Sequence, residues 1–221
     1  MGAWYYEFMK ITKLGHCCLV IEYKGKRILT DPGSYSSSQN EVKDIDLILI
    51  THEHPDHLHI ESLEMILQNN PQIKIITNTS VGEIIKQKGI IFDIVEDGQN
   101  TIFDEILIEG FGTKHEEIYQ EMGRVQNTGY FIDNKLFYPG DAFTNPGKPI
   151  EILALPIVAP WMHFKTAIQY AIEVKPKTIF PVHDGMLIPG RVGPIYRLPP
   201  QIFEPYNIKF IPLQEGESFE A

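Results

Sequence analysis

Hydrophobic and polar positions along the chain follow two rhythms. Short segments in which apolar residues alternate with polar ones, or run continuously, predict strands, and segments with apolar residues every three to four positions predict helices. The expected strands are 5–12, 16–23, 26–30, 46–50, 73–77, 90–94, 100–103, 106–111, 128–133, 135–139, 152–155, 178–182 and 207–212. The expected helices are 59–69 and 163–174, and a third opens at Thr79 or Ser80.

The order of these elements predicts the architecture. Two β-rich stretches are each followed by αβ units, which favours an α/β fold with two sheets packed together and helices outside. Lys24-Gly25 and Asp133-Asn134 supply the turns of two hairpins. Segment 184–201 contains Pro189, Pro194, Pro199 and Pro200, so we expect an irregular loop there.

Composition narrows the class of protein. The 221 residues include 19 Lys+Arg and 29 Asp+Glu, a net charge of −10, which argues against non-specific nucleic-acid binding. No run approaches the ~20 apolar residues that span a bilayer. Residues 1–10 resemble neither a signal peptide nor a myristoylation signal. We therefore expect a cytoplasmic protein with one domain over 1–221, in which Cys17 and Cys18 are buried, reduced and on opposite strand faces.

Histidines gather after the apolar segment 45–50. Four of the chain's eight histidines lie between 52 and 59, in the run Thr51-His52-Glu53-His54-Pro55-Asp56-His57 and at His59 just beyond it. In extended backbone His52 and His54 project to one side, and the turn at Pro55 lets Asp56 and His57 face the same pocket. Imidazole and carboxylate suit Zn²⁺, Mn²⁺ or Fe²⁺. The alternative is a polar helix cap with Asp56 at the cap position.

Further ligand candidates end other strand-like runs. His115 follows Phe111-Gly112, Asp141 follows Pro139-Gly140, and His183 follows Pro181-Val182. Taken singly each could be a surface-loop residue. Strand ends are where α/β folds place functional groups, so the three could converge on one rim with the first motif.

His52-x-His54-x-Asp56-His57, followed by His115, Gly140-Asp141 and His183, resembles the metallo-β-lactamase superfamily of metal-dependent hydrolases. The resemblance implies a four-layer αββα sandwich with two metal ions at its edge, zinc first, with manganese or iron as alternatives. It assigns His52, His54 and His115 to the first ion and Asp56, His57 and His183 to the second. Asp141 would bridge the two ions.

A narrower resemblance lies near the N-terminus. Leu14-Gly15-His16 before Cys17-Cys18-Leu19, and Thr30-Asp31-Pro32 further on, look like the branch of ascorbate-6-phosphate lactonase-like hydrolases. The pattern favours a catalytic role for His16 near the site, the alternative being an ordinary strand histidine. Asp31 is interpreted as a turn-forming or supporting carboxylate rather than a ligand.

Two departures from the superfamily pattern limit which properties of the superfamily can be expected of this chain. Glu53 and Pro55 stand where many members have glycine, which changes the pocket and not the ligands. Asp141 stands where some β-lactamases use cysteine, which weighs against β-lactamase activity.

The implied activity is hydrolysis of a small ester, lactone or phosphoester by a metal-bridging hydroxide, with Asp56 orienting it. The alternatives are a nuclease on the same fold, or a metal-binding redox or sensor protein without hydrolysis. We expect a small, anionic substrate, with no nucleic acid and no membrane as partner, and a homo-oligomer stays open. Rim candidates, each of which could instead serve packing or solvent, are Lys114, Trp161, His163, Arg191, Tyr196 and Arg197.

Overall fold

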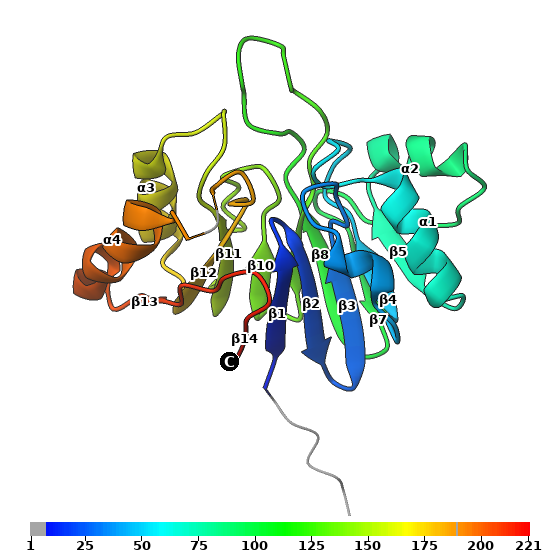
Figure 1. Ribbon diagram of the computed structural model, residues 1–221, viewed down its shortest axis with the longest axis horizontal. Helices are drawn as coiled ribbons and strands as arrows, with labels where there is room; N and C mark the ends of the chain where they lie inside the picture. The colour runs from blue at the N-terminus through cyan, green and yellow to red at the C-terminus, as the bar shows by residue number, and fades with distance from the viewer. Residues whose placement is uncertain (1–7, 189) are drawn as a thin grey trace, which may run out of the picture.

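The computed structural model describes residues 8–188 and 190–221, and over these residues the strands form two mixed sheets of seven (Figure 1). The first sheet has the order β14 (Ser218–Glu220), β1 (Lys10–Gly15), β2 (Cys18–Tyr23), β3 (Lys26–Thr30), β4 (Leu47–Leu49), β5 (Lys74–Thr77) and β6 (Asp93–Ile94). The second has the order β13 (Lys209–Phe210), β12 (Thr178–Val182), β11 (Ile152–Pro156), β10 (Leu136–Tyr138), β9 (Gly129–Ile132), β8 (Ile106–Phe111) and β7 (Asn100–Phe103).

Helices cover the outer face of each sheet. α1 (Ile60–Asn69) and α2 (Thr79–Lys86) lie outside the first sheet, and α3 (Phe164–Val174) and α4 (Gly193–Phe203) lie outside the second (Figure 1). Short 3-10 turns occupy Ser38–Glu41 and Glu204–Tyr206. The result is the αββα sandwich that the sequence predicts, which is the metallo-β-lactamase fold.

Three apolar clusters hold the four layers together. The central cluster lies between the sheets and includes Ile11, Leu47, Tyr130 and Phe180. Each sheet has a further cluster against its own helices, and burial of this apolar surface is the main stabilising contribution. Cys17 belongs to the central cluster and the free Cys18 to an outer one, so the two side chains lie on opposite faces as expected.

Parallel pairing fixes where the functional side chains lie. β3, β4 and β5 pair in parallel, as do β10, β11 and β12. The carboxyl ends of such strands share one edge, at the top of the molecule in Figure 1, and that edge is where α/β sheets present ligand-binding groups.

The expectation of a loop over 184–201 is wrong in its second half, because Gly193–Phe203 forms helix α4. Pro194 sits in the first turn, where its missing N–H costs nothing. Pro199 and Pro200 lie inside the helix. Ile195, Tyr196, Pro199, Ile202 and Phe203 pack inward at helical spacing, and this packing outweighs the two missing hydrogen bonds.

Other elements differ at their ends. The strand expected at 16–23 begins at Cys18, because His16 adopts a φ of 43° in the turn between β1 and β2. Residues 5–7 of the strand expected at 5–12 lie outside the described residues. The strands expected at 90–94 and 207–212 shrink to two residues each, and β14 was not expected. Across the described residues, no helix has the length and apolarity needed to cross a bilayer.

Candidate metal centre

The histidine motif occupies the loop directly after β4, and a turn shapes it. The backbone N–H of His57 donates to the carbonyl of His54 at 2.9 Å, closing the turn at Pro55. Gly33 packs against this turn so closely that a Cβ there would stand 1.8 Å from the Asp56 carbonyl oxygen. Only glycine fits at position 33, and the loop after β3 therefore supports the motif from below.

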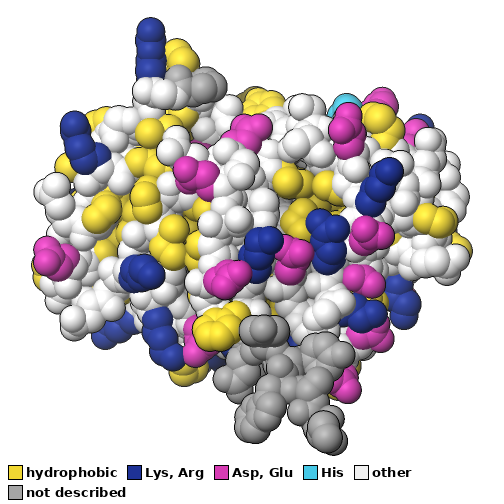
Figure 2. Space-filling model, turned by 60° about the horizontal axis from the view of Figure 1, so that its bottom comes forward, with side chains coloured by type: hydrophobic (Ala, Val, Ile, Leu, Met, Phe, Trp, Pro, Cys, Tyr) yellow, Lys and Arg dark blue, Asp and Glu magenta, His cyan; other side chains and the backbone are white. Residues whose placement is uncertain are grey.

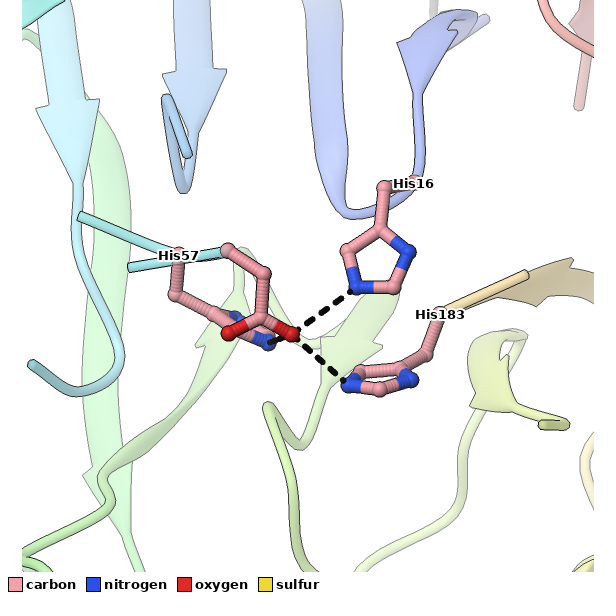
Figure 3. Close-up of side chains that lie close together, drawn as sticks. His16, His57 and His183 are labelled. Atoms are coloured by element: carbon pink, nitrogen blue, oxygen red, sulfur yellow. Dashed lines mark hydrogen bonds and ion pairs between the residues drawn. The ribbon is translucent and has the colours of Figure 1, made fainter. Parts of the chain in front are cut away.

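The side chains of the motif meet those from the second sheet in two clusters. His52, His54 and His115 place one nitrogen each within 4.8 Å of one another. Asp56, His57 and His183 form the second cluster under the same distance, together with His16 (Figure 3). All seven metal ligands expected from the sequence, with His16, are therefore at one edge of the sandwich.

Asp141 lies between the two clusters. Its Oδ2 atom is 3.2 Å from His115 Nε2 and 2.8 Å from His183 Nε2, and its Oδ1 atom is 3.2 Å from His57 Nε2. The side chain is 2% exposed. The carboxylate therefore contacts histidines of both clusters, which places it to join two ions.

Hydrogen bonds at the Nδ1 atoms of four imidazole rings determine which ring nitrogen faces the centre. The Nδ1 atom of His57 donates to Asp31 Oδ2 at 2.7 Å, and that of His183 donates to the Val158 carbonyl at 2.6 Å. His115 Nδ1 donates to the Glu116 carbonyl. The Thr51 hydroxyl gives its proton to Asp31, so it accepts one from His52 Nδ1. Each ring then turns its Nε2 atom toward the centre, and this is the nitrogen through which a histidine held at Nδ1 binds a metal.

The buried donor atoms fit divalent cations. The Nε2 atom of His52 is buried without a hydrogen-bond partner among the described residues, and the Nε2 atoms of His57 and His183 face the carboxylate oxygens of Asp56 and Asp141. A buried polar atom left without a partner costs about 1–3 kcal/mol, and imidazole nitrogens gathered around carboxylates suit a cation between them. Imidazole nitrogens with carboxylate oxygens are the ligand set of Zn²⁺, Mn²⁺ and Fe²⁺.

The electrostatics of the centre also favour positive charge. Burial alone would lower the pKa of His57 and of His183, yet the Asp141 carboxylate in particular raises both above the ordinary histidine range. Burial would raise the pKa of Asp141, but its positive neighbours His57 and His183 hold it well below the usual value. The pocket therefore attracts cations to the positions where the second cluster would hold one.

His16 differs from the other histidines of the second cluster. The backbone N–H of Gly185 donates to its Nδ1 atom at 2.9 Å, so its proton sits on Nε2, which faces Asp56 Oδ2 at 3.2 Å. Burial lowers its pKa to about 4, which keeps the ring neutral at pH 7. A nitrogen that carries a proton does not bind a metal, so His16 is a hydrogen-bond donor to Asp56 rather than a ligand.

Several residues at the centre were not expected from the sequence. Thr51 and Tyr138 both donate to Asp31, and this network beneath His57 confirms Asp31 as a supporting carboxylate. Cys17 Sγ lies within 4.8 Å of ligand atoms of His57 and Asp141. The sequence shows Cys17 only as an apolar strand residue; its place one residue after His16 is the signal that could have found it.

The rim candidates divide between the centre and the surface. Trp161 is half-buried and its Nε1–H donates to Asp141 Oδ2 at 3.0 Å, which makes it part of the pocket wall. Tyr196 is buried in α4 and donates to Asp184, the residue after His183. Lys114, Arg191 and Arg197 are exposed, and His163 is the residue that precedes the first turn of α3.

Comparison with known proteins decides the family. The sequence profile of the Beta-lactamase superfamily domain matches residues 10–183. The chain belongs to the β-lactamase superfamily. A relative of this superfamily member, protein Rv0786c of Mycobacterium tuberculosis, is 31% identical over 193 residues, 85% of this chain and 90% of the relative. The match to the family covers β1 to His183, so it spans the whole candidate centre.

Other similar proteins carry more descriptive names. The UPF0173 metal-dependent hydrolase Acid345_3437 of Koribacter versatilis is 27% identical over 201 residues, 80% of this chain and 84% of the relative. The structure of Igni18, a metallo hydrolase of Ignicoccus hospitalis, superposes with a TM-score of 0.74 at 21% identity, covering 97% of this chain and 98% of the other. At that identity the likeness shows the fold of this superfamily member. The ascorbate-6-phosphate lactonase-like branch finds no support among these relatives.

Proposed function

We propose that this β-lactamase superfamily member is a metal-dependent hydrolase of a small ester, lactone or phosphoester. The observation that carries the proposal is the convergence of buried Nε2 atoms around the Asp141 carboxylate. In this proposal His52, His54 and His115 hold one divalent ion and Asp56, His57 and His183 hold another, with Asp141 between them. Zinc is the first choice of metal, with manganese or iron as alternatives. Relatives named metal-dependent hydrolases support hydrolysis that depends on a metal, without naming it.

Bound divalent ions would polarise a carbonyl or phosphoryl oxygen and acidify water. The chain's own residues then orient the reactants. His16 Nε2–H donates to Asp56 and holds this carboxylate in place, and the low pKa of His16 keeps the ring neutral beside the reacting atoms. Trp161 Nε1–H fixes the Asp141 carboxylate on the opposite side and excludes water with its ring. The absence of a cysteine at position 141 keeps β-lactam cleavage out of the proposal.

The proposed substrate is a small molecule whose reacting end is anionic. Metal ions in the pocket of a chain with a net charge of −10 concentrate positive potential at one point. A long polyanion needs an extended basic track instead. On the face shown in Figure 2, where the end of the molecule away from the centre comes forward, Lys and Arg side chains are interleaved with Asp and Glu. A lactone is included because of the residues around His16, and we place the protein in the cytoplasm, where Cys17 and Cys18 stay reduced.

Metal analysis joined to a substrate screen tests the proposal. Purified protein is expected to hold up to two zinc, manganese or iron ions per chain and to hydrolyse aryl esters, lactones or phosphodiesters. His57→Ala should lose one ion and at least ~100-fold in kcat/KM. His59→Ala is the matched control, because His59 lies in the same stretch but bonds Ser62 at the start of α1.

Three outcomes would contradict the proposal. Cleavage of DNA or RNA with no turnover of small esters would favour a nuclease. A tightly bound di-iron centre with visible absorption and no hydrolysis would favour a redox or sensor protein. Equal metal content and equal turnover in wild type and His57→Ala would contradict the proposed metal centre itself.

A further inference from the structure

A cleft adjoins His16 on the side away from the metal ligands. Its larger part, of about 550 Å³, is lined by Ser34, Tyr35, Ser36, Ser37, Met186 and Glu215. An adjoining part of about 280 Å³ shares Tyr35 and Glu215 and is closed by His16 and Lys13. We call the two parts together the His16 cleft. It lies between the loop after β3, the loop after β12 and the turn before β14.

The walls of the cleft are tied to His16. The Tyr35 ring lies edge-on against the His16 ring with centroids 5.1 Å apart, and the loop after His183 bonds His16 through Gly185. Gly15, at a φ of 144°, lets the Glu215 side chain and Ser36 approach the end of β1; a Cβ there would stand 3.4 Å from Glu215 Cδ. The exposed Glu215 side chain therefore lies next to Gly15, the residue before His16, and Ser36 packs against the same glycine.

The charge of the cleft is negative. Lys13 is its one cation among the lining residues, and this side chain, 1% exposed, already pairs with Asp184 at 2.7 Å and donates to the Pro181 carbonyl. Glu215 makes no ion pair within the described part of the chain. The remaining polar lining consists mainly of hydroxyl groups, which are neutral, with an amide at Gln214. A carboxylate that lines the same cleft as an exposed aromatic ring favours an organic cation and disfavours an anion.

We propose that the His16 cleft binds the positively charged end of the substrate, an organic ammonium group, between Tyr35 and Glu215. The proposal rests on the hydrolase function above, because it describes the far end of the same molecule. The reacting oxygens would lie at the metal ligands and the ammonium group on the other side of His16. The substrate class is then a compact ester or phosphoester that also carries a cation.

Binding of choline tests the cleft without any catalysis. Choline and its neutral isostere 3,3-dimethyl-1-butanol are titrated into metal-free and zinc-loaded protein by calorimetry or NMR. Choline should bind at least ~5-fold more tightly than the isostere, about 1 kcal/mol at ~1.4 kcal/mol per tenfold. Glu215→Gln should remove that preference, and Tyr35→Leu should reduce it. Glu83→Gln, which makes the same charge change on the exposed face of α2, should leave it unchanged.

Turnover separates this proposal from the hydrolase function. Acetylcholine and 3,3-dimethylbutyl acetate carry the same ester and differ only in charge, so the ratio of their kcat/KM values reports the cleft. Glu215→Gln should lower that ratio about 5-fold while turnover of the neutral ester stays constant. Hydrolysis of neither ester with choline binding intact would count against the hydrolase function alone. Equal binding of choline and isostere, no choline binding, or a preference that survives Glu215→Gln would overturn the cation site.

Discussion

Replacing Asp31 offers a direct test of how the centre is built, because this carboxylate touches no proposed metal position. It is fully buried and accepts four hydrogen bonds, from the Thr51 N–H at 2.8 Å, the Thr51 hydroxyl at 2.7 Å, the Tyr138 hydroxyl at 2.5 Å and His57 Nδ1 at 2.7 Å. Its backbone has a φ of 34°, which aspartate and asparagine tolerate better than most residues. Asp31→Asn therefore removes charge with little change in shape.

The expected magnitudes follow from these bonds. In Asp31→Asn the new amide group, with its oxygen toward His57, would point its N–H₂ at the Thr51 N–H, leaving one buried donor unpaired and costing about 1–3 kcal/mol in unfolding free energy. Asp31→Ala leaves both the Thr51 N–H and His57 Nδ1–H unpaired, and so costs about 2–6 kcal/mol. The two hydroxyl groups can turn to other acceptors, since Tyr138 already lies 3.2 Å from the Cys17 carbonyl.

Metal affinity should fall only in the second cluster. Loss of a charged partner behind a ligating histidine typically weakens metal binding ~10–100-fold, which is about 1.4–2.8 kcal/mol. Titration with a zinc chelator should therefore remove one ion from Asp31→Asn earlier than from wild type, while the ion at His52, His54 and His115 dissociates as before. Asp46→Asn is the control, because it alters a carboxylate that also accepts a backbone N–H, from Arg27. Two ions bound with wild-type affinity in Asp31→Asn would refute the reasoning.

Other expected outcomes concern charge at the same edge. Lys13→Met should lower the unfolding free energy in urea by about 3 kcal/mol, because it leaves Asp184 facing a buried site without its cation; an unchanged value would contradict this. Below pH ~6.5 the unfolded chain protonates His16 while the folded chain, with a pKa of about 4, does not, so His16 alone should cost metal-free wild type up to about 3 kcal/mol between those values. His52 and His54, whose pKa values burial also lowers, add the same loss to wild type and to His16→Gln, so the variant should lose correspondingly less; parallel pH profiles would disprove it. Asp141→Asn should weaken metal binding and turnover together, and full occupancy with normal turnover would exclude Asp141.

The alternating and continuous apolar runs predicted most of the fold, because each strand is buried on one face or on both. The exception is α4. Its three prolines led to the prediction of a loop, although its apolar residues have the spacing of a helix. Local helix propensity is a weak effect compared with tertiary packing. On this helix the Phe203 side chain is fully buried against the second sheet. Reading residues 195–203 by period instead of by proline content would have found it.

The first motif was predictable for a different reason. His52, His54, Asp56 and His57 lie within six residues of chain, so their spacing alone brings them together. Asp31 acts on His57 across 26 residues, and Trp161 on Asp141 across 20, and such contacts depend on which strands pair. The tautomer of His16 likewise depends on Gly185, which no local pattern connects to it.

The proposed metal ligands come from both halves of the chain, and this has a consequence for synthesis. As a polypeptide emerges from the ribosome at about 5–20 residues per second, its N-terminal part folds first. The motif at 52–57 is then present while His115 and His183 have not yet been made, so the early chain offers ions only part of each ligand set. Complete metal loading must therefore follow translation of His183 and closure of the second sheet. A chain that terminated before that residue could not complete the second ligand cluster.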